Sequence, residues 1–114
     1  MSRIYKILST EAWETAVAAG VFAGAPVDLA DGFIHFSTAD QVAETAGKHF
    51  AGRAGLVLAA FDAHAFGAAL KWEISRGGAR FPHLYATLDP ALALRVAPLP
   101  VGPDGRHDFT GLLT

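Results

Sequence analysis

The sequence predicts one α+β domain over residues 1–114, built on a curved, mainly antiparallel sheet, continuous or split in two, with two or three helices. A chain of 114 residues fits a single core and leaves no room for a second. With 52% hydrophobic and only 18% charged residues, the chain can bury that core. Helical patterns occur early and strand-like runs dominate the second half, which is typical of α+β proteins.

The first 32 residues predict a strand, a helix and an irregular connection. Apolar side chains lie on both faces of the segment Arg3 to Leu8, as in a strand near the middle of a sheet. Ser9 or Thr10 can cap the helix that follows, and Gly20 ends it. Glycine, proline and aspartate residues then mark residues 21–32 as an irregular connection.

A second strand and a second helix follow. The segment Phe33 to Ser37 has the composition of a strand. The next four residues have the spacing of a capping box, with Thr38 as the N-cap and Gln41 reaching back. Apolar residues then recur at helical spacing as far as Gly52, so this pattern predicts a well-defined amphipathic helix.

The remaining elements are mostly strands. Gly55 to Phe61 is an apolar run of strand length, and an alanine-rich turn or short helix leads from it to Leu70. Lys71 to Ser75 predicts a fourth strand. The alternating run from Ala91 to Leu99 predicts a fifth, which ends where prolines become frequent.

Composition excludes several classes of function. A net charge of -2 and a pI near 6.2 provide no basic surface for an extended nucleic acid, although a single nucleotide still fits a pocket. The chain has no cysteine, which removes disulfides, thiolate zinc sites and cysteine nucleophiles. No signal-peptide pattern opens the chain, and no stretch has the ~18 apolar residues of a membrane span. We therefore expect a cytoplasmic protein that binds a small molecule and no membrane.

Two histidines, His35 and His83, stand between large apolar residues that hold them rigidly. Strand geometry puts His35 and Ser37 on one face, so both can point into one cleft. The first backbone N–H groups of the helix after Thr38 can hold a ligand phosphate. A core histidine bonded to a carbonyl, beside a threonine that only caps the helix, explains the same residues.

His83 belongs to a stiff aromatic segment. Pro82 fixes its own φ and pushes the preceding residue to an extended conformation. His83 and Tyr85 then share one side and can address one ligand, with Arg80 placed for a carboxylate or phosphate. A buried aromatic turn with internally bonded polar tips is the alternative. If both histidines serve one site, His35 and His83 lie within ~10 Å of each other.

Glu73 interrupts an apolar strand, between Trp72 and Ile74, two side chains that we expect to be buried. A carboxylate in such a place pairs with a nearby cation or works as a base or hydroxyl-binding group. The candidate cations are Lys71, Arg76 and Arg80.

Several segments occur in the order of a known family: Ile4 to Ile7, Trp13, Gly32 to Thr38, Trp72-Glu73 and Phe81 to Tyr85. On these segments, which span nearly the whole chain, the sequence resembles the domain of unknown function 952 (DUF952) family. That family is grouped with ADP-ribosyltransferase-like folds, so the resemblance implies NAD or ADP-ribose bound between two small sheets. It also implies a role for Lys6 on the first strand, where relatives often have histidine. Ser37 and Thr38 match the hydroxyl-bearing strand, and Glu73 matches the later glutamate.

Three hypotheses of function follow. The first is a pocket for a nucleotide-like or phosphorylated molecule, with NAD or ADP-ribose as the expected cofactor class, in a transferase. Its predicted catalytic residues are Glu73 and His35, and its predicted ligand-binding residues are Lys6, Ser37, Thr38, Arg80, His83 and Tyr85. The second is a ligand sensor without catalysis. The third is a metal-dependent hydrolase that uses His35, His83 and Glu73, although their spacing matches no zinc signature.

Overall fold

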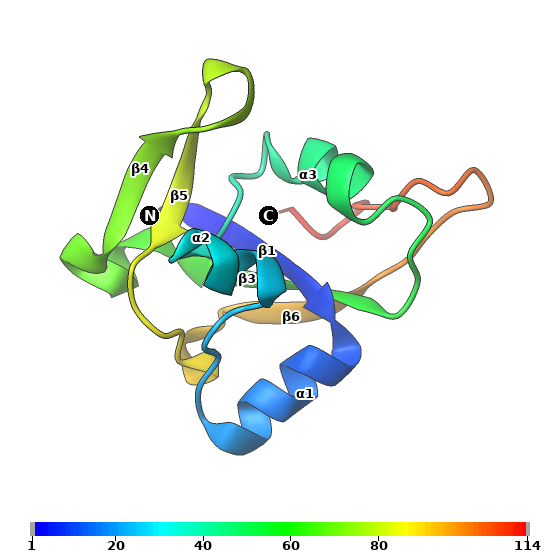
Figure 1. Cartoon of the computed structure of the whole chain (residues 1–114). Helices are drawn as coiled ribbons and strands as arrows, with labels where there is room; N and C mark the ends of the chain where they lie inside the picture. The colour runs from blue at the N-terminus through cyan, green and yellow to red at the C-terminus, as the bar shows by residue number, and fades with distance from the viewer. Residues whose placement is uncertain (1, 114) are drawn as a thin grey trace.

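Two three-stranded antiparallel sheets carry the fold (Figure 1) of the computed structural model, which describes residues 2–113 apart from the side chain of Arg76. The first sheet has the order β1-β3-β6, formed by β1 (Arg3–Ser9), β3 (Leu56–Asp62) and β6 (Arg95–Leu99). The second has the order β2-β5-β4, formed by β2 (Ile34–His35), β5 (Arg80–Leu84) and β4 (Leu70–Ile74). The predicted α+β class with antiparallel sheets is confirmed.

Three α-helices and three 3₁₀ turns complete the described chain: α1 (Thr10–Ala19), α2 (Pro26–Asp31), α3 (Val42–His49), η1 (Ala63–Ala69), η2 (Arg76–Gly78) and η3 (Pro90–Leu92). The first helix begins and ends as predicted. The hydroxyl of Ser9 accepts a hydrogen bond from the amide of Ala12. Gly20 closes the helix with a φ of 75°, which a residue without a Cβ adopts readily.

The expected irregular connection over residues 21–32 is wrong, because α2 forms within it. Pro26 starts this helix, where its missing N–H costs nothing and its fixed φ favours the first turn. The carboxylate of Asp28 accepts a hydrogen bond from the backbone N–H of Ala25 at 2.8 Å. This short helix carries Asp28 into the interior, where it is 1% exposed.

The expected N-cap at Thr38 is also wrong. The side chain of Gln41 reaches back and accepts from the amide of Thr38 at 3.1 Å, as predicted. The four residues form a turn rather than the first turn of the helix, because the amides of Gln41 and Val42 both donate to the carbonyl of Thr38. The helix α3 therefore begins at Val42 and closes at Phe50, before Gly52.

The second strand is shorter than its composition predicts, because the chain changes sheets. The amide of Phe36 still donates to the carbonyl of Pro82 in β5. One residue later Ser37 pairs with Tyr5 of β1, through N–H to O distances of 2.7 and 2.9 Å. This pair connects the two sheets. The last predicted strand is likewise confirmed only over Arg95–Leu99, since η3 takes up its beginning.

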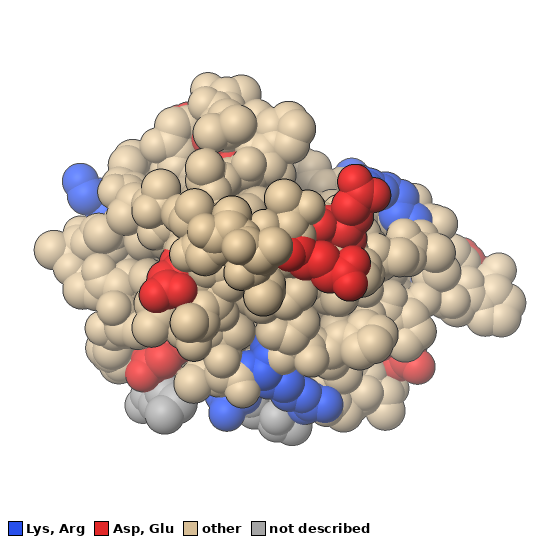
Figure 2. Space-filling model, turned by 90° about the horizontal axis from the view of Figure 1, so that it is seen from below, with Lys and Arg blue, Asp and Glu red and all other residues tan. Residues whose placement is uncertain are grey.

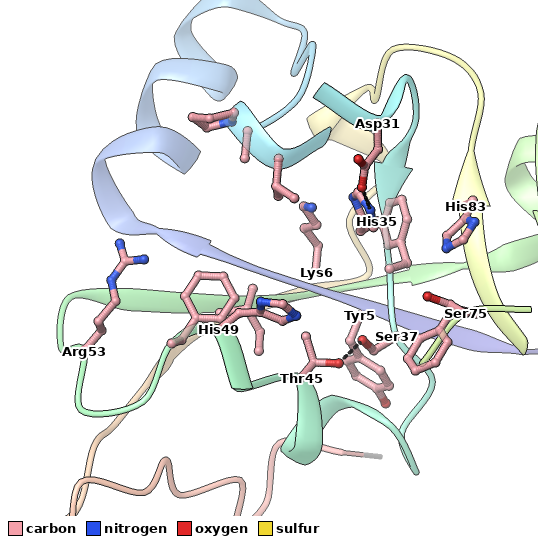
Figure 3. A pocket seen from close by; sticks show the side chains of 17 residues that line it. Tyr5, Lys6, Asp31, His35, Ser37, Thr45, His49, Arg53, Ser75 and His83 are labelled. Atoms are coloured by element: carbon pink, nitrogen blue, oxygen red, sulfur yellow. Dashed lines mark hydrogen bonds and ion pairs between the residues drawn. The ribbon is translucent and has the colours of Figure 1, made fainter. Parts of the chain in front are cut away.

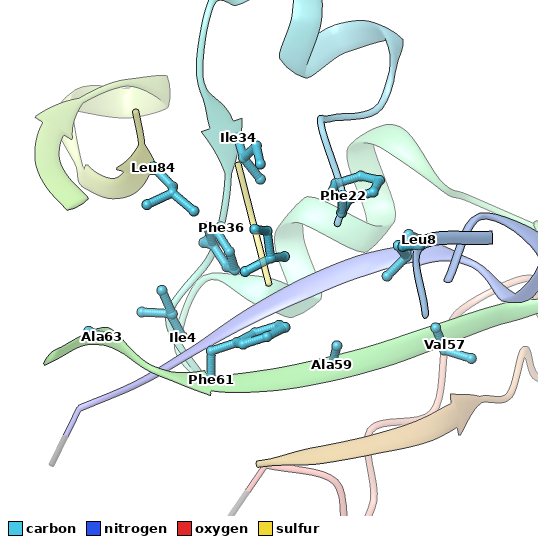
Figure 4. Packing of buried hydrophobic residues seen from close by; sticks show 12 residues of the cluster. Ile4, Leu8, Phe22, Ile34, Phe36, Val57, Ala59, Phe61, Ala63 and Leu84 are labelled. Atoms are coloured by element: carbon cyan, nitrogen blue, oxygen red, sulfur yellow. The ribbon is translucent and has the colours of Figure 1, made fainter. Parts of the chain in front are cut away.

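The core lies on both faces of the β1-β3-β6 sheet, in agreement with the two apolar faces predicted for β1. On one face, Ile4 and the fully buried Phe61 pack against the segment that carries Phe36 (Figure 4). The rings of Phe61 and Phe36 meet edge to face, with centroids 5.7 Å apart. On the other face, Tyr5 packs in the cluster that contains Val42 of α3.

The surface shows small groups of charge. On the face shown in Figure 2, Lys and Arg side chains lie in separate groups near Asp and Glu side chains. No helix within residues 2–113 is long and apolar enough to cross a membrane.

Candidate functional site

A cavity of about 510 Å³ lies over β1, between α2 and α3 (Figure 3). Its polar lining comes from five elements and includes four of the predicted site residues, Lys6, His35, Ser37 and His83. The ring centroids of His35 and His83 are 5.6 Å apart, and the two residues are cross-strand partners in β2 and β5. The prediction that both histidines share one cleft is therefore confirmed.

The other four predicted residues do not line the cavity. Thr38 lies in the turn before α3, and Arg80 is exposed at the start of β5, where its carbonyl accepts from the side chain of Gln41. Glu73 and Tyr85 are not among the lining residues, but Oε1 of Glu73 contacts both Nδ1 of His83 and the hydroxyl of Tyr85. Their contribution to a site passes through His83.

Asp28, which no sequence pattern indicated, organises the floor of the candidate site. Each oxygen of its carboxylate lies 3.0 Å from Nζ of Lys6. It also accepts from the backbone N–H of His35 at 3.0 Å and from Nδ1 of that ring at 2.6 Å. With the amide of Ala25 as a further donor, one buried carboxylate fixes Lys6 and His35 together.

Burial and hydrogen bonding act against each other in this cluster. Burial alone raises the pKa of Asp28, but the hydrogen bond from His35 and the charge of Lys6 outweigh it. The pKa of Asp28 therefore lies well below its ordinary value. Burial lowers the pKa of Lys6, and the neighbouring carboxylate only partly compensates. The cluster thus presents an ammonium ion held against a firmly ionised carboxylate.

His35 is held from both sides by carboxylates. Its Nδ1 contacts Asp28, and its Nε2 lies 2.9 Å from Oδ2 of Asp31. The Asp31 side chain is half exposed and lines the cavity. A ligand reaches Nε2 of His35 only by displacing Asp31.

Glu73 holds His83 and Tyr85. Its Oε1 lies 2.9 Å from Nδ1 of His83 and accepts the phenol proton of Tyr85 at 2.6 Å. The hydrogen bonds from Tyr85 and His83 lower the pKa of Glu73. The bond between Tyr85 and Glu73 also raises the pKa of Tyr85. The Glu73 carboxylate is thus an acceptor for both neighbours.

The expected burial of the side chains beside Glu73 is wrong. Trp72 and Ile74 are 40% and 68% exposed, and their strand, β4, lies at the edge of its sheet. Of the expected cations, Lys71 lies over the Tyr85 ring at 5.1 Å. The side chain of Arg76 lies outside the described part of the chain. Among the described side chains, Glu73 forms hydrogen bonds with two aromatic residues, His83 of β5 and Tyr85 just after it.

The cavity wall on the α3 side was not predicted. Thr45 and His49, four residues apart, lie on one face of α3, and Arg53 lines the same wall from the loop after the helix. The hydroxyl of Thr45 bonds to that of Ser37 at 2.8 Å. The Arg53 guanidinium lies 5.2 Å from the centre of the Phe50 ring.

The metal site proposed as one alternative is not found. Within residues 2–113, no group of three His, Asp or Glu side chains is placed to hold a metal ion. The geometry explains this result, because both nitrogens of His35 face carboxylates and Nδ1 of His83 is bonded to Glu73. The described residues therefore do not support the metal-dependent hydrolase.

The chain is an α+β protein with two small antiparallel sheets and a cavity lined in part by histidines. The chain matches the family described as a protein of unknown function (DUF952) over residues 7–96, and it belongs to that family. It is similar to CC0527 from Caulobacter crescentus, at 52% identity over 98% of both chains, with a TM-score of 0.95 to its crystal structure. The solution NMR structure of CC0527 gives 53% identity and a TM-score of 0.87, with 96% of this chain and 94% of that chain covered. No curated protein matches the chain.

Proposed function

We propose that the cavity binds a small phosphorylated, nucleotide-like molecule, of the class that includes NAD and ADP-ribose. One observation carries the proposal: five nitrogen-bearing side chains from β1, β2, β5, α3 and the loop after it line one cavity. They are Lys6, His35, His49, Arg53 and His83. Among the described lining residues, Asp31 is the one acidic side chain. Phosphate oxygens accept hydrogen bonds and carry negative charge, so they suit the cationic side chains of this set, Lys6 and Arg53.

Size and position support the same ligand class. A volume of about 510 Å³ is in the range of small-molecule sites. The cavity extends to Tyr5 and Ser37, where the two sheets join, which agrees with the ADP-ribosyltransferase-like arrangement that the family resemblance implies. Glu73 does not reach the cavity, so a transferase role passes to His83 in this proposal.

A sensor without catalysis is the second candidate. It is favoured by the two carboxylates on His35, which leave neither ring nitrogen free to move a proton. Incubation of the protein with NAD, followed by chromatography of the mixture, distinguishes the two candidates. A transferase consumes NAD, whereas a sensor leaves it unchanged.

Thermal shift measurements with NAD, ADP-ribose, AMP and inorganic phosphate test the binding proposal. A ligand at 100 times its dissociation constant adds about 2.7 kcal/mol of stability. Replacing Arg53 with alanine removes one charged donor, worth about 1.5–3 kcal/mol, so affinity falls by roughly 10- to 100-fold. Arg106→Ala, at an exposed position that does not line the cavity, is the matched control. Absence of any shift, or equal effects of the two variants, contradicts the proposal.

A further inference from the structure

We infer that the ligand of this cavity is a phosphorylated sugar, free or within a nucleotide, whose hydroxyl group donates a hydrogen bond to Nε2 of His83. The inference rests on the proposed function and adds the orientation of the ligand. The phosphate lies toward Arg53 and His49, and the sugar lies toward His83.

The carboxylate of Glu73 determines which nitrogen of His83 carries the proton. Nδ1 lies 2.9 Å from Oε1 of Glu73, a carboxylate that can only accept. Tyr85 donates its proton to the same oxygen, so Glu73 stays ionised and keeps its acceptor role. In the neutral ring the proton is therefore on Nδ1, and Nε2 carries a lone pair.

The lone pair on Nε2 of His83 is accessible from the cavity. No described residue bonds to Nε2 of His83. Every buried side-chain nitrogen or oxygen in the described part of the chain has a partner, so Nε2 must be reachable from the cavity that His83 lines. The ring is held flat against Phe33, with centroids 4.0 Å apart and 25° between the planes. Nε2 of His83 is thus a hydrogen-bond acceptor held in a fixed position on the cavity wall.

Arg53 lines the other end of the cavity. Figure 3 shows Arg53 and His83 at opposite ends, with Lys6 between them. Arg53 offers only donors, and its planar guanidinium suits phosphate. An acceptor at one end and the Arg53 guanidinium at the other select a molecule with a hydroxyl and a phosphate at different ends. A phosphorylated sugar has this polarity, whereas inorganic phosphate satisfies only the Arg53 end.

Isothermal titrations with AMP, 2′,3′-dideoxy-AMP and inorganic phosphate test the inference. The wild-type protein is expected to bind AMP about 5- to 20-fold more tightly than the dideoxy compound, since a site built for a hydroxyl rejects the analogue that lacks it. In His83→Phe, which keeps a ring against Phe33, this preference disappears while phosphate binding remains. His64→Phe, at an exposed histidine away from the cavity, keeps the preference.

Nitrogen NMR of the histidine rings provides a second measurement that needs no ligand. The neutral His83 ring is expected to carry its proton on Nδ1, and Glu73→Ala is expected to move part of the population to the other tautomer. A proton on Nε2 in the wild-type protein overturns the inference. So does phosphate binding without preference for AMP over the dideoxy compound. If neither AMP nor phosphate binds, the proposed function itself fails, which is a different result.

Discussion

Lys6 and Asp28 form a buried ion pair below the cavity, with Nζ 3.0 Å from both carboxylate oxygens and the side chains 7% and 1% exposed. The pair joins β1, an outer strand of the first sheet, to the short helix α2. Because Asp28 also holds the ring of His35, the position of one wall of the cavity depends on this carboxylate.

Replacing Asp28 is expected to be among the most damaging single changes in the chain. Asp28→Asn leaves the Lys6 ammonium in the interior without its counter-ion, a loss of about 3–5 kcal/mol of unfolding free energy. Lys6→Met is expected to cost less, because Asp28 keeps its bonds from His35 and Ala25. Urea denaturation of both variants measures the difference, with the exposed Asp40→Asn as control. Equal losses for the three variants contradict a structural role for the pair.

The same carboxylate predicts how stability changes with pH. The pKa of Asp28 is lower in the folded protein than the ~3.9 of an unfolded chain, so the unfolded state binds more protons in acid. The contribution of Asp28 is fully present above about pH 4 and is lost as pH falls toward the folded-state pKa. Urea midpoints between pH 2 and 6 should fall less steeply in Asp28→Asn than in the wild type. Carbon NMR provides a direct check: the Asp28 carboxyl signal of the folded wild type should remain that of a carboxylate at pH 3.

Glu73 is expected to matter for binding rather than for stability. Its side chain is 39% exposed, so Glu73→Gln should leave the unfolding free energy almost unchanged. Binding of AMP should weaken, because an amide orients the His83 ring less firmly than a carboxylate does. Denaturant midpoints and titrations in the same samples decide the point, with Glu14→Gln on the exposed side of α1 as the matched control. A clear loss of stability with binding intact contradicts a role for Glu73 in the site.

Removal of Asp31 is expected to strengthen anion binding. The Asp31 carboxylate is hydrogen-bonded to Nε2 of His35 and places a negative charge in the cavity. Asp31→Asn should improve the affinity for inorganic phosphate by about 1 kcal/mol, or roughly 5-fold, at low ionic strength. The gain should shrink in high salt. Weaker phosphate binding in this variant means that Asp31 helps to form the site rather than competing with the ligand.

Local patterns predicted most of the elements, because their causes are local. The alternation in β1 and the caps at Ser9 and Gly20 depend only on neighbouring residues. The helix α2 was missed because its proline and nearby glycine also occur in loops. What stabilises its buried carboxylate is Lys6, 22 residues earlier in the chain, and no local pattern reports that contact.

The candidate site was predicted in part for the same reason. The shared cleft of His35 and His83 follows from two strands with matching residue types. The partners of Glu73 depend on the β4–β5 register, which pairs Glu73 with Phe81 and Lys71 with His83. Its exposure depends on β4 being an edge strand. Both facts belong to the sheet, so the segment around Glu73 alone indicated a buried carboxylate among cations.

The pairing of Tyr5 with Ser37 has a consequence for how such proteins can diversify. Within residues 2–113 this residue pair is the one ladder contact between the two sheets, and the cavity opens beside it. Substitutions in α2 or α3 can therefore widen or narrow the opening without disturbing the hydrogen bonds inside either sheet. Under the proposed function, relatives with the same core can accommodate ligands of different size, and comparison of their cavities is more informative about those ligands than comparison of their folds.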